Sequence, residues 1–160
     1  MTRSGGKRVR NQILRGAVAG VAGTVVMTIP IVVSQRLRLF HTPPPEEISD
    51  NVARRTWLLP DHSHRYFPII SIAAHLGYGA TCGTLFSPLR RWLPGSEWIA
   101  GPLFGLSVWA VSYLGFVPAL RLYPWPADDS RPRQVVMIVA HGMFGLTVAG
   151  VDDRLRQGAH

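Results

Sequence analysis

The sequence predicts an all-α protein that spans a membrane as a four-helix bundle, and three observations lead to this fold class. Four stretches, over residues 16–35, 66–89, 98–120 and 134–151, contain no Asp, Glu, Lys or Arg. A helix crosses a hydrocarbon core with about 20 residues, and each stretch is close to that length. Only 16% of the 160 residues are charged although 47% are hydrophobic, whereas soluble domains carry about 25% charged residues. We therefore expect one membrane domain, residues 1–160.

The first span is expected at about residues 14–36, behind a basic N-terminal segment that contains Arg3, Lys7, Arg8, Arg10 and Arg15. Its apolar run is longer than that of a cleaved signal peptide, so it is expected to remain as an anchor. Positive charge next to the first span favours the cytoplasmic side. The sequence thus predicts a multi-pass membrane protein with both termini in the cytoplasm. The net charge of +8 is assigned to membrane lipids as partners, and no nucleic-acid partner is expected.

The first loop is expected to contain an amphipathic surface helix at about residues 45–58. Three prolines precede it, Glu46 and Glu47 come early, and Arg54 and Arg55 come late, an order that complements the helix dipole. Two placements are open: the helix lies flat on the outer membrane face, or it caps the bundle. The segment Asp61-His62-Ser63-His64 that follows is similar to part of a metal site. Zinc needs three or four ligands, so no metal site is predicted.

The remaining spans are expected at about residues 66–89, 98–120 and 134–151. Trp92 and Trp98 lie on either side of the short link between the second and third spans, while Tyr123 and Trp125 mark the opposite interface. Aromatic rings with a polar edge prefer the headgroup level of a bilayer. The linker over residues 121–133 contains three prolines and is expected to be irregular.

An internal repeat relates the two halves of the chain. A shift of 66 residues aligns the second span with the fourth in the pattern A-H-x-x-[YF]-G-x-T, which matches His75 with His141. The first and third spans share the spacing Gly16-x-x-x-Gly20 and Gly101-x-x-x-Gly105. The sequence therefore predicts two parallel helix pairs related by an axis along the membrane normal.

Glycines four residues apart let membrane helices approach closely. We expect a tight bundle on this basis, and a homo-oligomer formed through the glycine-rich helix faces.

His75 and His141 are the only histidines within the predicted spans, and an ionisable residue at membrane depth is a functional hypothesis by default. Three interpretations are open. The pair could bond helices together through hydroxyl or carbonyl groups. It could provide the two axial ligands of haem b, or it could relay protons or sense pH.

No metalloprotease, nucleophile-elbow, P-loop or dinucleotide-binding motif is present, so no catalytic residue is predicted and the expectation leans away from an enzyme. The sequence indicates a non-enzymatic accessory protein of the envelope, and a stress-related role is what the family resemblance described next implies. The alternatives are a bis-histidine haem protein for electron transfer and a small transporter or proton-responsive protein.

The Gly-rich first span, the long polar loop, His75-x-x-x-Gly79 and a last span with Ala140-His141 that ends in D-D-R-L-R together resemble the YagU-like family of bacterial inner-membrane proteins. The resemblance covers about Arg15 to Arg156. It implies four helices, an inner-membrane location, a loose link to acid tolerance and no established biochemical activity. His75 and His141 match intramembrane histidines of that family. The triple proline and the D-H-S-H segment do not match its pattern.

Overall fold

The computed structural model describes residues 3–39, 44–56 and 67–158. Within these ranges the regular elements are all helical, which confirms the all-α class. In chain order they are α1 (Arg3–Arg36), α2 (Pro44–Thr56), α3 (Phe67–Leu89), η2 (Arg90–Trp92), α4 (Glu97–Val111), η3 (Ser112–Phe116), α5 (Val117–Ala119), η4 (Pro126–Asp128) and α6 (Arg131–Gln157).

Four helical segments are long and apolar enough to cross a membrane: Gly6–Arg36, Pro68–Trp92, Glu97–Ala119 and Arg131–Gln157. Large apolar side chains on their outer surfaces are exposed, among them Val25, Ile72 and Val111. A soluble monomer rarely exposes apolar surface on this scale, whereas lipid chains would cover it. The structure therefore has the features of a multi-span membrane protein. The basic N-terminal segment, expected as a tail, is helical from Arg3 and continuous with the first span.

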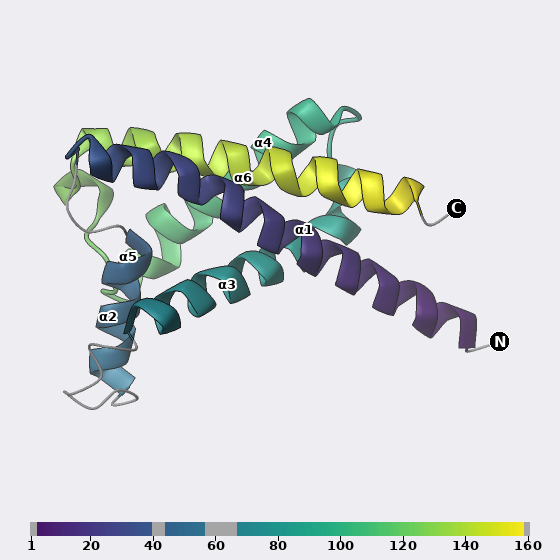
Figure 1. The fold of residues 1–160 in the computed structure, drawn as a ribbon, viewed down its shortest axis with the longest axis horizontal. Coiled ribbons are helices and arrows are strands. Elements are labelled where there is room, and N and C mark those ends of the chain that lie inside the picture. Colours follow the sequence, from purple (N-terminus) through teal and green to yellow (C-terminus); the bar gives the residue numbers. More distant parts are fainter. Residues whose placement is uncertain (1–2, 40–43, 57–66, 159–160) are drawn as a thin grey trace.

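The four long helices lie in the spatial order α3, α1, α6, α4, since α1 packs against α3 and α6, and α6 also packs against α4. The start of α1 and the end of α6 lie at the same end of the molecule (Figure 1). The short helix α2 lies at the opposite end, across the direction of the long helices (Figure 1). An even number of crossings requires the two termini on one side, and this arrangement provides it.

Glycines line both tight helix pairs. A Cβ added to Gly20 would collide with the carbonyl oxygen of Gly79 in the α1–α3 pair, and one added to Gly105 would collide with that of His141 in the α4–α6 pair. The absence of side chains lets these backbones approach each other, as the spacing predicted. Most of the predicted glycine faces are therefore used inside the monomer. A homo-oligomer through glycines stays a prediction, and Gly77 and Gly142 are glycines with open space beside them.

The third long helix changes its winding near its end. After α4, the chain makes a π-helical turn in η3, in which the N–H of Val117 donates to the carbonyl of Ser112, five residues earlier. Pro118 follows and brings no N–H of its own. Single π-turns inside helices occur frequently at functional sites, and three of the residues in this one, Ser112, Tyr113 and Phe116, line the cavity described below.

The first and third long helices end in the same way. Arg38 and Arg121 have φ of 56° and 55°, which places both in the left-handed region. The N–H of the residue after each, Leu39 or Leu122, donates to a carbonyl five residues earlier. This is the Schellman arrangement of a helix C-terminus. It occurs at Leu37-Arg38-Leu39 in one half and at Leu120-Arg121-Leu122 in the other.

Candidate functional site

A cavity of about 550 Å³ lies among the four long helices and α2, within the range of roughly 300–1,000 Å³ that is typical of small-molecule sites. The tight pair α1 and α3 forms one wall of the cavity, and the tight pair α4 and α6, together with η3, forms the opposite wall. The cavity is partly open, and its open side lies between α3 and η3. There the lining residues Ile70, Tyr78 and Phe116 are each at least 39% exposed.

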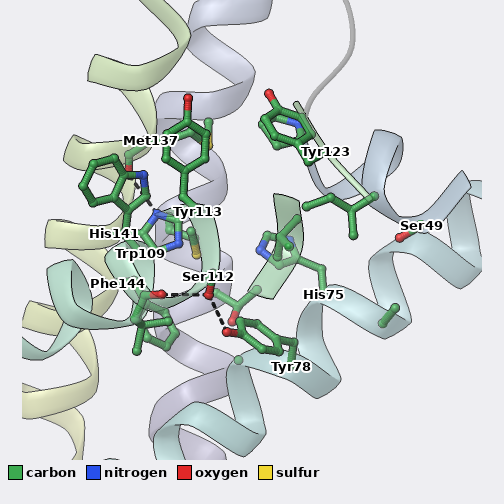
Figure 2. Close-up of a pocket in the computed structure, with 18 of the residues that line it drawn as sticks. Ser49, His75, Tyr78, Trp109, Ser112, Tyr113, Tyr123, Met137, His141 and Phe144 are labelled. Atoms are coloured by element: carbon green, nitrogen blue, oxygen red, sulfur yellow. Dashed lines mark hydrogen bonds between the residues drawn. The ribbon is translucent and has the colours of Figure 1, made fainter. Parts of the chain in front are cut away.

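Both histidines predicted from the repeat line this one cavity. Figure 2 shows His141 beside Trp109 on one wall and His75 with Tyr78 on the other. The Nδ1 of His141 is 2.8 Å from the carbonyl oxygen of Met137. A carbonyl only accepts, so Nδ1 carries the hydrogen and Nε2 keeps its lone pair in the neutral ring. His75 also lines the cavity and makes no hydrogen bond with the described residues.

Three further polar side chains belong to the walls. The indole Nε1 of Trp109 is buried and has no hydrogen-bond partner among the described residues. On the opposite side, the hydroxyl of Tyr78 lies 2.7 Å from that of Ser112, and Ser112 donates to the carbonyl of Val108 at 2.7 Å. Since Ser112 has one hydrogen and uses it on Val108, Tyr78 donates to Ser112. This bond connects α3 to the π-turn across the cavity (Figure 2).

The helix α2 closes one end of the cavity. Its side chains Ile48, Val52 and Ala53 are part of the lining. Asn51 donates to the carbonyl of Leu122 at 3.0 Å, and Arg55 donates to the carbonyls of Leu120 and Arg121. Of the two placements left open by the sequence, these contacts favour the cap. The helix begins and ends close to the predicted bounds, although residues 57 and 58 lie outside the described part.

Asp129 holds the other side of this end together. Its Oδ2 accepts hydrogen bonds from Tyr113 at 2.8 Å and from Tyr123 at 3.3 Å. Arg133 lies 3.3 Å from Oδ1 of the same carboxylate and donates to the Tyr123 hydroxyl at 2.7 Å. Burial raises the pKa of Tyr123 well above its ordinary value, so the hydroxyl keeps its hydrogen and remains a donor. Tyr113 and Tyr123 both line the cavity, so Asp129 positions two of its residues from outside.

The structure thus brings the two histidines of the long helices to one cavity. His41 and the segment Asp61-His62-Ser63-His64 lie outside the described residues. Within the described ranges, no group of three or more His, Cys, Asp or Glu could hold a metal ion. The contribution of Trp109 to the site was not predicted. The i, i+4 spacing of Trp109 and Tyr113 places both on one helix face and could have indicated it.

Residues 10–160 match a family described as a family of unknown function, DUF6789. The chain belongs to this family. The match covers all four long helices of this chain except for the first residues of α1. The cavity therefore lies entirely within the matched region. No curated protein and no solved structure matches the chain. The resemblance to YagU-like proteins is not tested by these comparisons and stays a prediction.

Proposed function

We propose that this protein is a non-enzymatic, multi-pass protein of the bacterial inner membrane that holds a neutral lipophilic molecule in the cavity between α3 and α4. The observation that carries the proposal is the cavity itself. It has the volume of a small-molecule site, an apolar lining and a few polar atoms directed into it. Ligand sites of this kind use the apolar surface for affinity and the polar atoms for orientation.

The composition of the lining supports a neutral ligand. The described residues that line the cavity include no Asp, Glu, Lys or Arg. A charged group placed there would lose its water without gaining an ionic partner, and such a transfer is unfavourable by many kcal/mol. A neutral molecule with one or two hydrogen-bonding groups avoids this cost.

The position of the open side supports a ligand that comes from the bilayer. It lies between α3 and η3, and both belong to segments that are long and apolar enough to cross a membrane. A molecule dissolved in lipid would reach the cavity by moving sideways between these helices. At the far end, α2 stands between the cavity and water.

Retention of a lipophilic molecule through purification tests the proposal. Solvent extracts of the purified chain, analysed by mass spectrometry, should contain a neutral lipophilic compound in stoichiometric amount. Ala74→Phe, which fills the lining at α3, should lose it. Ala73→Phe places the same ring on the neighbouring exposed position outside the lining and should keep it. Equal retention by the two variants, or none by the unmodified chain, would overturn the proposal.

Haem b is the second candidate ligand, because His141 Nε2 and His75 are both free to face an iron atom. The described lining offers no Lys or Arg for the two haem propionates, which favours the neutral ligand. An absorbance spectrum separates the two. A colourless preparation from haem-supplemented cells supports the neutral ligand. A Soret band that is present in the unmodified chain and lost in both His75→Ala and His141→Ala would show that haem is the ligand instead.

A transporter or proton-responsive protein was the remaining alternative. A proton path in a membrane usually includes a carboxylate, and no Asp or Glu lines the cavity in the described part of the chain. Proteoliposomes that show no pH-dependent flux would support the binding function over this one.

We also infer that the two helix pairs arose by duplication. Gly20 meets the carbonyl of Gly79 and the Cα of the next residue, Ala80. Gly101 meets the carbonyl of Gly145 and the Cα of Leu146 in the same way. Gly79 and Gly145 differ by the expected 66 positions, but the contacts align Gly101 with Gly20 rather than with Gly16. The left-handed Arg38 and Arg121 at the two helix ends support the same relationship.

The N-terminal basic cluster supports a cytoplasmic location for both ends of the chain. Reporter fusions after residue 160 test this placement, and a reporter active only outside the cytoplasm would reverse it.

A further inference from the structure

We propose that the molecule held in the cavity is an isoprenoid quinone, a neutral flat ring with two carbonyl oxygens and an apolar tail. This inference rests on the proposed function and names the ligand class of the same site. It is drawn from the hydrogen-bonding atoms on the two walls, the aromatic lining and the open side between α3 and η3.

The first hydrogen bond comes from Trp109. Its indole N–H is buried without a partner in the described part of the chain, and indole nitrogen only donates. A buried donor without a partner costs about 1–3 kcal/mol. The indole N–H is covered by neighbouring atoms, so an acceptor in the cavity removes that cost once the ring of Trp109, which lines the cavity, turns toward it. A quinone carbonyl is a neutral acceptor of this kind.

The second hydrogen bond comes from His75 on the opposite wall. Its ring lines the cavity and makes no hydrogen bond with the described residues, so among these residues nothing competes with a ligand for its N–H. Donors on opposite walls suit a ligand whose acceptors lie on opposite edges of one ring. A diacylglycerol or a sterol carries its polar group at one end and could satisfy one wall at a time.

The third polar atom, Nε2 of His141, accepts. It lies on the same wall as Trp109 (Figure 2). A hydroxyl placed between them could accept from the indole and donate to the imidazole. The reduced form of the ring, a quinol, carries such hydroxyls, so the same wall suits both redox forms of the ligand without any change in its own atoms.

Aromatic side chains supply the remaining surface. Tyr78, Trp109, Tyr113, Phe116 and Phe144 line the cavity, and Trp109 stacks on Tyr113 with ring centroids 5.3 Å apart. Flat rings pack well among such side chains. The tail would leave through the open side between α3 and η3 and run along lipid.

Quenching of Trp109 fluorescence tests the inference. The experiment uses a single-tryptophan variant of the full chain, which carries the substitutions Trp57→Phe, Trp92→Phe, Trp98→Phe and Trp125→Phe and keeps only Trp109. This variant is placed in quinone-free phosphatidylcholine nanodiscs. Decylubiquinone should quench the emission saturably at one molecule per chain. The saturable phase should disappear in Ala74→Phe and persist in Ala73→Phe. His75→Leu should weaken the affinity about three- to tenfold, the loss of one hydrogen bond.

A second measurement uses the chain with all its tryptophans, so that it remains informative if the single-tryptophan variant misfolds. The unmodified chain, loaded with decylubiquinone and passed over a desalting column, should retain about one quinone, and Ala74→Phe should retain none. Quenching that rises linearly with the quinone concentration and is equal in Ala74→Phe and Ala73→Phe would overturn the inference. Equal displacement of the quinone by dioleoylglycerol would overturn the quinone assignment alone, while cavity-dependent retention of another lipophilic compound would leave the proposed function standing. Failure of both experiments would remove both proposals.

Discussion

Arg15 and Asp152 are 137 positions apart and form an ion pair in which Nε donates to Oδ1 at 2.8 Å. Ser87 completes the group, since it accepts from Arg15 at 3.1 Å and donates to Asp152 at 2.9 Å. Three long helices, α1, α3 and α6, are thereby joined at the end of the molecule where both termini lie. Only 1% of the Asp152 side chain is exposed, against 20% for Arg15.

This asymmetry predicts unequal effects of the two neutralising variants. Arg15→Gln leaves a buried carboxylate without its cation, which costs about 3–5 kcal/mol. Asp152→Asn leaves a cation that can reach solvent, so we expect a smaller loss. The double variant should unfold at a higher temperature than Arg15→Gln alone. Thermal unfolding in detergent, followed by circular dichroism, measures all three.

Arg54→Gln is the matched control for this ion pair. Arg54 pairs with Asp50 at 2.7 Å, but both side chains are exposed, and exposed pairs contribute about 0–1 kcal/mol. A midpoint drop for Arg54→Gln as large as that for Arg15→Gln would contradict the role given to burial.

Gly20→Ala should destabilise the α1–α3 pair, and Gly105→Ala should destabilise the α4–α6 pair. Each new methyl would meet a backbone carbonyl, of Gly79 or of His141, and a helix backbone cannot yield as a flexible side chain can. Overpacking of this kind typically costs 1–3 kcal/mol. Gly77→Ala, with open space at the added Cβ, should be neutral or slightly stabilising because alanine favours helix more than glycine does. Unfolding midpoints in one detergent compare them, and equal losses for Gly77→Ala and Gly20→Ala would count against the close packing.

Local sequence patterns predicted the elements well, because each depends on neighbouring residues. The absence of charge over 18 to 24 residues marks a span wherever it occurs, and prolines followed by acids and then bases marked α2. The repeat around His75 and His141 predicted that two distant residues occupy equivalent positions. It did not place them on the same cavity, because that depends on how α3 and α4 lie on either side of α1 and α6.

The rest of the site depends on pairings that no local pattern contains. Asp129 looked like part of an irregular, proline-rich linker, yet it accepts hydrogen bonds from Tyr113 and Tyr123. Asp152 was counted among the charges outside the spans, yet it is buried against Arg15. The glycine spacing predicted close packing but aligned Gly101 with Gly16, since spacing alone cannot resolve a shift of one helical turn.

Arg121→Val should destabilise the protein, and Arg121→Gly should not. The positive φ of Arg121 is unfavourable for a β-branched residue, so valine should cost on the order of 1 kcal/mol or more. Glycine adopts this conformation without strain, and its greater freedom in the unfolded chain offsets the gain. Unfolding midpoints of the two variants provide the measurement, and a midpoint for Arg121→Val at or above that of Arg121→Gly would exclude the left-handed helix end.

The raised pKa of Tyr123 predicts a loss of stability at high pH. In the unfolded chain the hydroxyl ionises near pH 10, whereas in the folded protein burial keeps it protonated to higher pH. The contribution is therefore fully present below pH 10 and declines as the pH rises toward the folded pKa. Chemical unfolding between pH 8 and pH 11 should show a decline above pH 10 that is shallower in Tyr123→Phe. An unchanged profile in that variant would show that Tyr123 titrates alike in both states.

Asp129→Asn should weaken ligand binding more than it weakens the fold. The carboxylate accepts from both cavity tyrosines and faces Arg133, and hydrogen bonds to a charged group contribute about 1.5–3 kcal/mol. Asparagine keeps the size of the side chain but offers one weaker, uncharged acceptor, so Tyr113 is held less firmly in the cavity wall. We expect the affinity for the bound lipophilic molecule to fall by about tenfold or more.

Asp128→Asn supplies the control for this last variant, because Asp128 is the adjacent, exposed carboxylate. It should bind the ligand as the unmodified chain does. Binding and unfolding are measured on the same preparations, so a general loss of structure in Asp129→Asn would be visible as a lower midpoint. Equal affinities for the two variants would mean that Asp129 holds the linker alone and does not shape the cavity. A selective loss in Asp129→Asn would show that a residue outside the cavity sets the position of its wall.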